Sequence, residues 1–302
     1  MLQSIGTQDT GSLAADALAL LHQLWEVVHQ THLPLPLPNP VSLLRQDMPQ
    51  LCKAGNPYHV SAKLDGMRYL LLLGNHADTG ESYAVLIARN HDVYRLKLES
   101  TDPTVWYGTL MDCELLEDGK LVVFDVMAHC GMDCKKQPYT ARMAAAQPVL
   151  KSLSPLHITC KPFWPLDQIS SVTSEWKQDG LIFMPEHVPV QLGMHRSMFK
   201  WKPLHTIDFA LGADGKLSYT TAAGVAPIET FDLALTPSPA YTEALEHAPC
   251  IVECQCLPRK SVEVLHQRPD KTVPNFERTV RLTLRNIDEN VQLEELVQCY
   301  QR

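Results

Sequence analysis

Short apolar segments separated by turn-forming residues fill this chain from residue 58 onward, and they constrain its fold more than any other feature. The segments are five to eight residues long and rich in Leu, Val, Ile and Tyr, which is typical of strands in an antiparallel sheet. They are Tyr69–Leu73, Ser82–Ala88, Val93–Leu98, Thr109–Leu116, Leu121–Met127 and Gly180–Met184. The pair Asp118-Gly119 separates two of them, as in a tight hairpin. We therefore predict an α+β domain rich in antiparallel sheet.

Helical segments flank these strands. Residues 12–30 carry apolar side chains at three-and-four spacing, which predicts one helix with a single apolar stripe. We expect that stripe to pack on its own domain, although it could instead dock a partner. Residues 137–153 are rich in Ala and predict a second helix. The last residues predict a third helix, in which Asp288 caps the first turn.

A proline-rich stretch marks the first boundary between parts of the chain. Residues 33–40 read LPLPLPNP, and these prolines fix φ and remove backbone donors, so an extended connector is expected. A second strand-rich region begins after residue 205. We predict four parts: a helix and connector over 1–40, an α+β domain over 41–204, a second domain over 205–285, and a closing helix over 286–302 that packs back on the core.

Composition places the chain among ordinary globular proteins. Its 302 residues are 45% hydrophobic and 20% charged. The formal net charge of -8 provides no bulk attraction for nucleic acid, so an RNA substrate would need a local basic cleft. No apolar run approaches the roughly 20 residues that span a bilayer, so no membrane segment is expected.

The nine cysteines bear on the cellular compartment. Their number is odd, and neither Cys130 with Cys134 nor Cys250 with Cys254 shows the paired spacing of a structural zinc site. The N-terminus also lacks the basic start and the apolar core of a secretory signal. We expect free thiols, no zinc, and an intracellular, reducing compartment.

The sharpest local motif is KLDGMR, which begins at Lys63 and comes immediately before a predicted strand. A lysine attacks phosphorus only as the free amine, and its reference pKa of about 10.4 leaves little free amine at neutral pH. Neighbouring cations and partial burial favour the free amine. Arg68, Arg89, Lys200 and Lys202 can supply those cations, and the two lysines share one face of an extended strand. The pattern indicates a nucleophilic lysine in a cleft for polyphosphate.

Carboxylates recur at the ends of other predicted strands, as Glu114, Asp125 and Asp179. Hard divalent cations prefer oxygen ligands, so acids that converge on a polyphosphate would suit Mg²⁺ or Mn²⁺. Each short motif alone is equally typical of an exposed turn. Their order and spacing carry more information than any one of them.

In that order the motifs resemble those of the covalent nucleotidyltransferases, the superfamily of mRNA capping enzymes and polynucleotide ligases. The matching strings are KLDGMR at 63–68, IARNHDVYR at 87–95, MDCELL at 111–116, VVFDVM at 122–127, DGLIF at 179–183 and FKWKP at 199–203. Two further strings, NPVSL at 39–43 and RPDKTVPN at 268–275, are similar to those of the capping branch. The resemblance covers residues 40–276 and departs from the family at Cys113, where the family often has Gly.

The resemblance implies a nucleotidyltransferase domain of the ligase and capping type, followed by an OB-fold β-barrel that closes over the nucleotide as a lid. It also implies roles for individual residues, with Lys63 as the catalytic nucleophile that carries GMP. The implied nucleotide-binding residues are Asp65, Arg68, Arg89, Glu114, Phe124, Lys161, Asp179, Lys200, Lys202, Arg268, Asp270 and Lys271. Within this set, Phe124 would stack on guanine, Lys161 would face its edge, and the last three would act on the leaving pyrophosphate from the lid. Glu114, Asp179 and Asp208 would place the metal.

The implied activity is mRNA guanylyltransfer from GTP, with Mg²⁺ or Mn²⁺, to the 5′-diphosphate end of RNA. A separate RNA triphosphatase, a separate cap guanine-N7 methyltransferase and the transcription machinery are the implied partners. The location would be nuclear in a cell, or otherwise viral or cytoplasmic. Two alternatives stay open: an ATP-dependent RNA or DNA ligase, and a catalytically inactive module that binds nucleotide or RNA.

Overall fold

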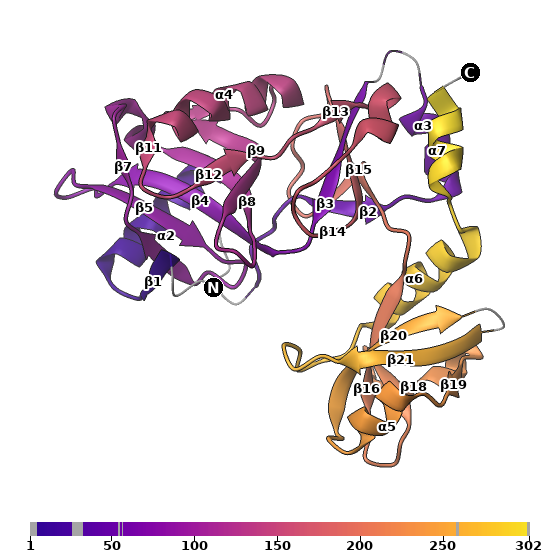
Figure 1. Cartoon of the computed structure of the whole chain (residues 1–302). Coiled ribbons are helices and arrows are strands. Elements are labelled where there is room, and N and C mark those ends of the chain that lie inside the picture. Colours follow the sequence, from indigo (N-terminus) through magenta and orange to yellow (C-terminus); the bar gives the residue numbers. More distant parts are fainter. Residues whose placement is uncertain (1–4, 26–32, 54, 56, 258–259, 301–302) are drawn as a thin grey trace. The chain divides into compact units, whose positions relative to one another are not determined.

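Two compact units make up the chain in the computed structural model (Figure 1), which describes residues 5–25, 33–53, 55, 57–257 and 260–300. The first unit is drawn from residues 1–41, 49–201 and 300–302, and the second from residues 42–48 and 202–299. The division between Trp201 and Lys202 lies three residues before the expected start of the second domain at 205. Residues 42–48 group with the second unit, although we expect them in the first.

The first unit is built on a large sheet with the strand order β1-β6-β5-β4-β8-β9-β10 and with β12 beside β9. These strands are β1 (Gly6–Asp9), β4 (Met67–Asn75), β5 (Ser82–Ile87), β6 (Val93–Leu96), β8 (Thr109–Leu115), β9 (Leu121–His129), β10 (Met132–Asp133) and β12 (Ile158–Cys160). All pairings are antiparallel except that of β12 with β9. The predicted α+β class, rich in antiparallel sheet, is confirmed.

A helix covers each face of this sheet, α4 (Tyr139–Ser152) on one and α2 (Ser12–Trp25) on the other (Figure 1). Successive side chains of a strand point to opposite faces. Accordingly, Leu71 and Leu73 of β4 belong to the cluster with α4, whereas Leu70 and Leu72 belong to the cluster with α2. The apolar stripe of α2 is therefore buried on its own unit, where it forms part of the core. The predicted residues 26–30 of that helix lie outside the described residues.

A second sheet of the first unit has the strand order β13-β3-β14-β15-β2. Its strands are β2 (Asn39–Ser42), β3 (Tyr58–Leu64), β13 (Trp164–Pro165), β14 (Gln178–Pro185) and β15 (Met194–Trp201). Short elements complete this unit: the strands β7 (Glu99–Ser100) and β11 (Leu153–Ser154), the helix α3 (Met48–Leu51), and the 3-10 turns η2 (Pro103–Tyr107) and η3 (Leu166–Ser171). The 3-10 turn η1 (Arg45–Asp47) groups with the second unit. The expectation that KLDGMR precedes a strand is incomplete, because Lys63 itself lies within β3.

The second unit is a six-stranded sheet with the order β18-β17-β16-β20-β21-β19. Its elements are β16 (Thr206–Leu211), β17 (Leu217–Thr221), β18 (Gly224–Pro227), η4 (Ile228–Phe231), β19 (Ala234–Thr236), α5 (Pro239–Leu245), β20 (Cys250–Leu257), β21 (Ser261–Gln267), α6 (Glu277–Glu289) and α7 (Leu293–Tyr300). Its core contains Phe209 and Val252 from the sheet, Ala244 from α5 and Val280 from α6.

The prediction of a single closing helix over 286–302 is wrong in detail. The structure has two helices there, because Asn290 adopts the left-handed conformation with φ of 44° and ends α6. Asp288 lies inside α6 and does not cap it, since the helix begins at Glu277 with Phe276 at the N-cap. A polar residue before an apolar run can therefore lie late in one helix rather than at the start of the next.

The expectation that the cysteines carry free thiols is confirmed only in part. Cys113, Cys130, Cys134, Cys160, Cys250, Cys254 and Cys256 carry free thiols, whereas Cys52 is disulfide-bonded, so the expectation is wrong at that position. Among the described residues, no helix is long and apolar enough to cross a membrane.

A buried ion pair joins α4 to the centre of the large sheet. The guanidinium of Arg142 donates to both carboxylate oxygens of Asp125 on β9, at 2.7 and 3.0 Å, and their side chains are 1% and 3% exposed. Arg142 also donates to the carbonyl of Gln137 at 2.7 Å. Two charges buried together hold each other in place, because either one alone would be left without solvent or partner.

Arg142→Ala should therefore lower the free energy of unfolding of the first unit by about 3 to 5 kcal/mol, since it leaves Asp125 as an unpaired buried carboxylate. Urea unfolding followed by tryptophan fluorescence measures this, because Trp25, Trp106, Trp164, Trp176 and Trp201 all lie in that unit.

Lys120→Ala is the matched control, because it breaks an ion pair with Asp118 in which both side chains are about half exposed. We expect it to change the free energy of unfolding far less than Arg142→Ala does, because water screens an exposed pair. If both variants lost the same free energy of unfolding, burial would make the ion pair of Arg142 with Asp125 no more important for stability than an exposed pair.

Candidate active site

A cavity of about 260 Å³ in the first unit brings together six of the residues that the sequence singles out. They are Lys63, Arg68, Glu114, Phe124, Lys161 and Lys200. They come from both sheets of this unit: Arg68, Glu114 and Phe124 from β4, β8 and β9 of the large sheet, and Lys63 and Lys200 from β3 and β15 of the smaller one. Lys161 follows β12 directly.

Lys63 is positioned by the alternation of β3. The side chains of Tyr58, Val60, Ala62 and Leu64 are buried, so Ser61 and Lys63 lie on the opposite face, where both line the cavity. The ammonium of Lys63 is 2.6 Å from a carboxylate oxygen of Asp179. This ion pair occupies the Lys63 side chain, so Nζ must leave Asp179 before it can attack a phosphorus atom.

Gly66 allows the turn after Lys63 to approach β8 closely. A Cβ at this position would come within 2.6 Å of the carbonyl oxygen of Leu115 and 2.9 Å of Cγ of Glu114. The backbone amide of Gly66 also donates to the Glu114 carboxylate at 3.2 Å. The motif KLDGMR therefore requires a glycine at this position, because a side chain would clash with β8. The amide of Gly66 also connects the turn after Lys63 to Glu114.

Arg68 is fixed by a bidentate ion pair. Its Nε and Nη2 donate to Asp112 on β8 at 2.8 and 2.5 Å, and its Nη1 donates to Asn39 at 3.3 Å. Asp112 is completely buried. Burial raises the pKa of Asp112, and the neighbouring guanidinium opposes that rise. The sequence does not identify Asp112 as the partner of Arg68, because nothing in the residues of β8 indicates which strand Asp112 faces.

A β-bulge presents Phe124 to the cavity. The register between β8 and β9 shifts between Asp112 and Cys113, which pair with Asp125 and Val123, so Phe124 lies opposite no residue. A bulge redirects the side chain of the extra residue. Phe124 lies among buried neighbours yet is half-buried itself and lines the cavity.

Two cations flank the Phe124 ring. The guanidinium carbon of Arg68 lies 5.4 Å from the ring centroid, and the ammonium of Lys161 lies 5.1 Å from it, both within cation–π range. Lys161 is buried, and its burial, with Lys63 and Arg68 nearby, lowers its pKa to about 8, although Glu114 opposes this shift. Burial also raises the pKa of Glu114. The cavity thus combines several cations, one acid and one ring that can stack on a base.

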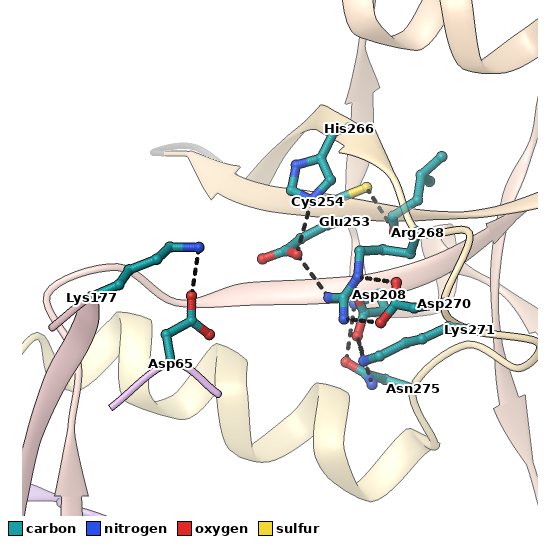
Figure 2. Close-up of polar contacts among 11 residues, drawn as sticks. Asp65, Lys177, Asp208, Glu253, Cys254, His266, Arg268, Asp270, Lys271 and Asn275 are labelled. Atoms are coloured by element: carbon teal, nitrogen blue, oxygen red, sulfur yellow. Dashed lines mark hydrogen bonds and ion pairs between the residues drawn. The ribbon is translucent and has the colours of Figure 1, made fainter. Parts of the chain in front are cut away.

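The other predicted residues lie elsewhere. Arg89 is exposed in the turn after β5 and does not line the cavity, and Asp65 is exposed and paired with Lys177 at 2.8 Å (Figure 2). Lys202 follows β15 and belongs to the second unit.

In the second unit, the segment RPDKTVPN forms one network of ion pairs (Figure 2). Arg268 contacts Asp208 at 3.1 Å, Glu253 at 2.8 Å and Asp270 at 2.8 Å, and Lys271 contacts Asp208. The hydrogen bond with Arg268 lowers the pKa of Asp270 to about 2, and the same contact raises the pKa of Arg268. Arg268 and Lys271, two of the predicted phosphate-binding cations, are therefore both held by carboxylates.

The three predicted metal ligands do not form one cluster. Within the described part of the chain, no group of three or more His, Cys, Asp or Glu side chains could hold a metal ion. Asp208 is held by Arg268 and Lys271 in the second unit, whereas Glu114 and Asp179 belong to the first. Mg²⁺ commonly takes one or two carboxylates together with phosphate oxygens. Glu114 and Asp179 fit that kind of shared site.

Several lining residues were not predicted. They are Ser61, Tyr139, Ile182, Met184 and Met198, with Pro38 and Pro40. Alternation could have found some of them, since Met198 lies two residues before Lys200 on β15 and Met184 lies two after Ile182 on β14. Tyr139 could not have been found in this way, because only tertiary packing brings the first turn of α4, which contains Tyr139, to the cavity.

The chain is similar in sequence to several known proteins. Residues 12–204 match the family model described as mRNA capping enzyme, catalytic domain. The chain is 28% identical over 217 residues to the mRNA-capping enzyme subunit alpha of Saccharomyces cerevisiae, which covers 58% of this chain and 47% of the yeast protein. It is 25% identical over 292 residues to the mRNA-capping enzyme of Caenorhabditis elegans, which covers 80% of this chain and 44% of the nematode protein.

A solved structure of mycobacterial DNA ligase D complexed with ATP and MES superposes with a TM-score of 0.46 at 15% identity, covering 81% of this chain and 98% of that one. The chain spans about half the length of the curated relatives that it matches. The family match covers residues 12–204, well over half of the 302 residues, and the resemblance in its motifs is thereby confirmed: this chain belongs to the family of mRNA capping enzyme catalytic domains.

Proposed function

We propose that this chain is an mRNA guanylyltransferase, which transfers GMP from GTP through Lys63 to the 5′-diphosphate end of RNA. The observation that carries the proposal is the convergence of Lys63, Arg68, Lys161 and Lys200 on one cavity that also holds the Phe124 ring. Cations of this kind bind a triphosphate, and the ring stacks on the base. The family match and the names of the relatives support the same activity.

The reaction has two half-reactions. In the first, Nζ of Lys63 forms a bond to the α-phosphorus of GTP, the bond from that phosphorus to the bridging oxygen breaks, and pyrophosphate leaves. In the second, a terminal phosphate oxygen of the RNA attacks the same phosphorus, and the phosphorus–nitrogen bond breaks to release GpppRNA and free Lys63. Positioning and neutralisation of charge account for most of the catalysis in such transfers.

The residues of the cavity divide this work between them. Lys63 gives up its contact with Asp179, which is the nearest acceptor for the ammonium proton, at 2.6 Å. Arg68, held by Asp112, and Lys200 bind phosphate oxygens, and Phe124 and Lys161 bind the base. A Mg²⁺ or Mn²⁺ ion bound by Glu114, Asp179 and phosphate would neutralise charge on the triphosphate.

We infer that the second unit is an OB-fold lid. Its six-stranded sheet and the position of RPDKTVPN directly after β21 support this inference. Arg268 and Lys271 would then exchange their carboxylate partners for the β- and γ-phosphate oxygens. An RNA triphosphatase and a guanine-N7 methyltransferase would supply the RNA 5′-diphosphate and methylate the product.

The two alternatives predict different behaviour. A ligase would use ATP in place of GTP, and the family match and the named relatives favour the capping branch instead. An inactive module would have no physical reason to keep a lysine on a cavity lined by other cations.

The first prediction is covalent labelling of the chain. Incubation with α-labelled GTP and Mg²⁺ or Mn²⁺ should leave the label on the protein in a denaturing gel, and Lys63→Ala should abolish it, because no amine then reaches the phosphorus. Lys120→Ala, on an exposed hairpin of the same unit, should label like the parent. A Lys63→Ala variant that labels as strongly as the parent would contradict the assignment of the nucleophile.

The second prediction separates the half-reactions. Lys271→Ala should slow formation of lysyl-GMP by about a hundredfold, the usual cost of removing one electrostatic contact to a transferring group. It should slow transfer of pre-formed GMP to RNA much less, because pyrophosphate has already left. Lys260→Ala is the control, since its pair with Asp232 is exposed in the same unit. Equal losses in both steps would exclude a role at the leaving group.

The third prediction is selectivity for guanine. Lys161 can donate to O6 of guanine, whereas adenine presents a donor there and would leave this buried cation unpaired. Such a mismatch costs about 1 to 3 kcal/mol or more, so GTP should be preferred by at least about tenfold to a hundredfold. Competition of unlabelled ATP against labelled GTP measures the preference, and Lys161→Ala should reduce it. ATP competing as well as GTP would favour the ligase alternative.

A further inference from the structure

Three side chains with little exposed surface form part of the lining of the active-site cavity. Tyr139 is 1% exposed, and Met184 and Met198 are each 6% exposed. All three line the cavity and pack in one cluster with Met143. Lys63, which also lines the cavity, has a side chain that is 24% exposed. The lining therefore includes an exposed cation and a buried, mostly apolar cluster.

Tyr139 is held by three contacts of its side chain. Its hydroxyl donates to the carbonyl of Phe124 at 3.2 Å, which places the tyrosine on the same stretch of β9 that presents the stacking ring. The guanidinium carbon of Arg142 lies 5.5 Å from the tyrosine ring centroid, and the Phe163 ring lies 4.9 Å away. The ring has no free direction in which to turn aside.

The backbone at Tyr139 is equally fixed. The carbonyl of Glu186 accepts from the amide of Tyr139 at 2.9 Å, and its carboxylate accepts from the amide of Thr140 at 3.1 Å. The same carboxylate is 2.9 Å from Nε2 of His59 on β3. Glu186 therefore anchors the first turn of α4 to the smaller sheet, and Tyr139 cannot move without breaking these bonds.

Its neighbours in the buried cluster differ in this respect. Met184 and Met198 have long unbranched side chains, which adapt their shape to what they contact. Of the three side chains, only the tyrosine is a rigid plane fixed at both its hydroxyl and its backbone. Tyr139 is thus the least adaptable of the three buried side chains in this part of the lining.

The chemistry of the nucleotide determines which part of it meets this buried cluster. With the phosphates beside Lys63, the base would enter the cavity with N9, the nitrogen bonded to the ribose, toward the phosphates. The edge of a purine farthest from N9 carries the substituents at positions 2 and 6. In this pose these substituents would point toward the buried cluster of Tyr139, Met184 and Met198.

We propose that Tyr139 is a specificity-determining residue that limits the size of the purine edge, so that nucleotides enlarged at position 2 or 6 are excluded. The proposal rests on the proposed function, because it takes the cavity to be the site of GTP. It adds a selection by size to the selection by hydrogen bonding at Lys161.

The test compares GTP with N2-benzyl-GTP and O6-benzyl-GTP in the labelling reaction. The parent enzyme should use both analogues at least about a hundredfold less efficiently than GTP. Tyr139→Ala should raise the efficiency with one or both analogues, relative to GTP, by at least about tenfold, as expected when one steric clash is removed. Tyr139→Phe keeps the ring and should leave that ratio unchanged within about threefold, although weaker anchoring of Phe124 can lower overall affinity.

Tyr83→Ala is the matched control. Tyr83 is as buried as Tyr139, at 3% exposed, but belongs to the cluster beneath α2 and does not line the cavity. Its loss should destabilise the same unit without admitting either analogue. Tyr139→Leu replaces Tyr139→Ala if tryptophan fluorescence shows that the alanine variant does not fold.

Binding of the same three nucleotides to Lys63→Ala, measured by calorimetry, separates the two proposals. If GTP labels no protein but still binds better than the analogues, and Tyr139→Ala in this background removes the difference, the proposed function fails and the role of Tyr139 holds. The role of Tyr139 is overturned if the parent accepts the analogues as readily as GTP. It is equally overturned if folded Tyr139→Ala or Tyr139→Leu still rejects both analogues.

Discussion

The bidentate ion pair between Arg68 and Asp112 is the contact on which the geometry of the cavity depends. Asp112 is fully buried on β8 and receives two hydrogen bonds from Arg68 on β4. A planar guanidinium held at two points has one orientation, and this orientation places its carbon 5.4 Å from the Phe124 ring. The pair thus sets together the position of Arg68, the proposed phosphate-binding cation, and of one side of the proposed base site. The desolvation of Arg68 and Asp112 is tolerated because each charge is paired with the other.

The large sheet carries a second pair of the same kind. Arg142 and Asp125 connect α4 to β9 at the residue next to Phe124. Asp112 and Asp125, the carboxylates of the two pairs, are partners in the β8–β9 register directly beside the bulge that exposes Phe124. Tyr139 adds a third support, since it binds the carbonyl of Phe124 itself.

Charge is balanced differently in the two units. In the cavity of the first unit, Lys161 and Lys200 line the site beside Lys63 and Arg68, and the low pKa of Lys161 reflects the cost of crowding a cation in a buried place. In the second unit, each of Arg268 and Lys271 contacts a carboxylate. Cations held by carboxylates bind phosphate only in exchange for those partners, so the second unit holds these proposed phosphate-binding groups in a neutralised network.

The sequence by itself determined the class of fold, six of the strands of the first unit and six of the side chains that line the cavity. Alternation along a strand is local, so the placement of Lys200 on one face of an extended strand follows from it. The order of the motifs also predicted the family. None of this depends on how distant segments meet.

Tertiary structure alone decided which of the predicted residues share a cavity. Arg89, like Arg68, is an arginine beside a predicted strand. It is nevertheless exposed in the turn after β5 and does not line the cavity. Asp112 became the partner of Arg68 through the register of β4 with β8, and Phe124 reached the site through a bulge that no local pattern encodes. Tyr139 lines the cavity because Glu186, far along the chain, anchors the first turn of α4. Pairing register, bulges and helix docking depend on contacts between distant residues, and a single sequence read locally contains no record of them.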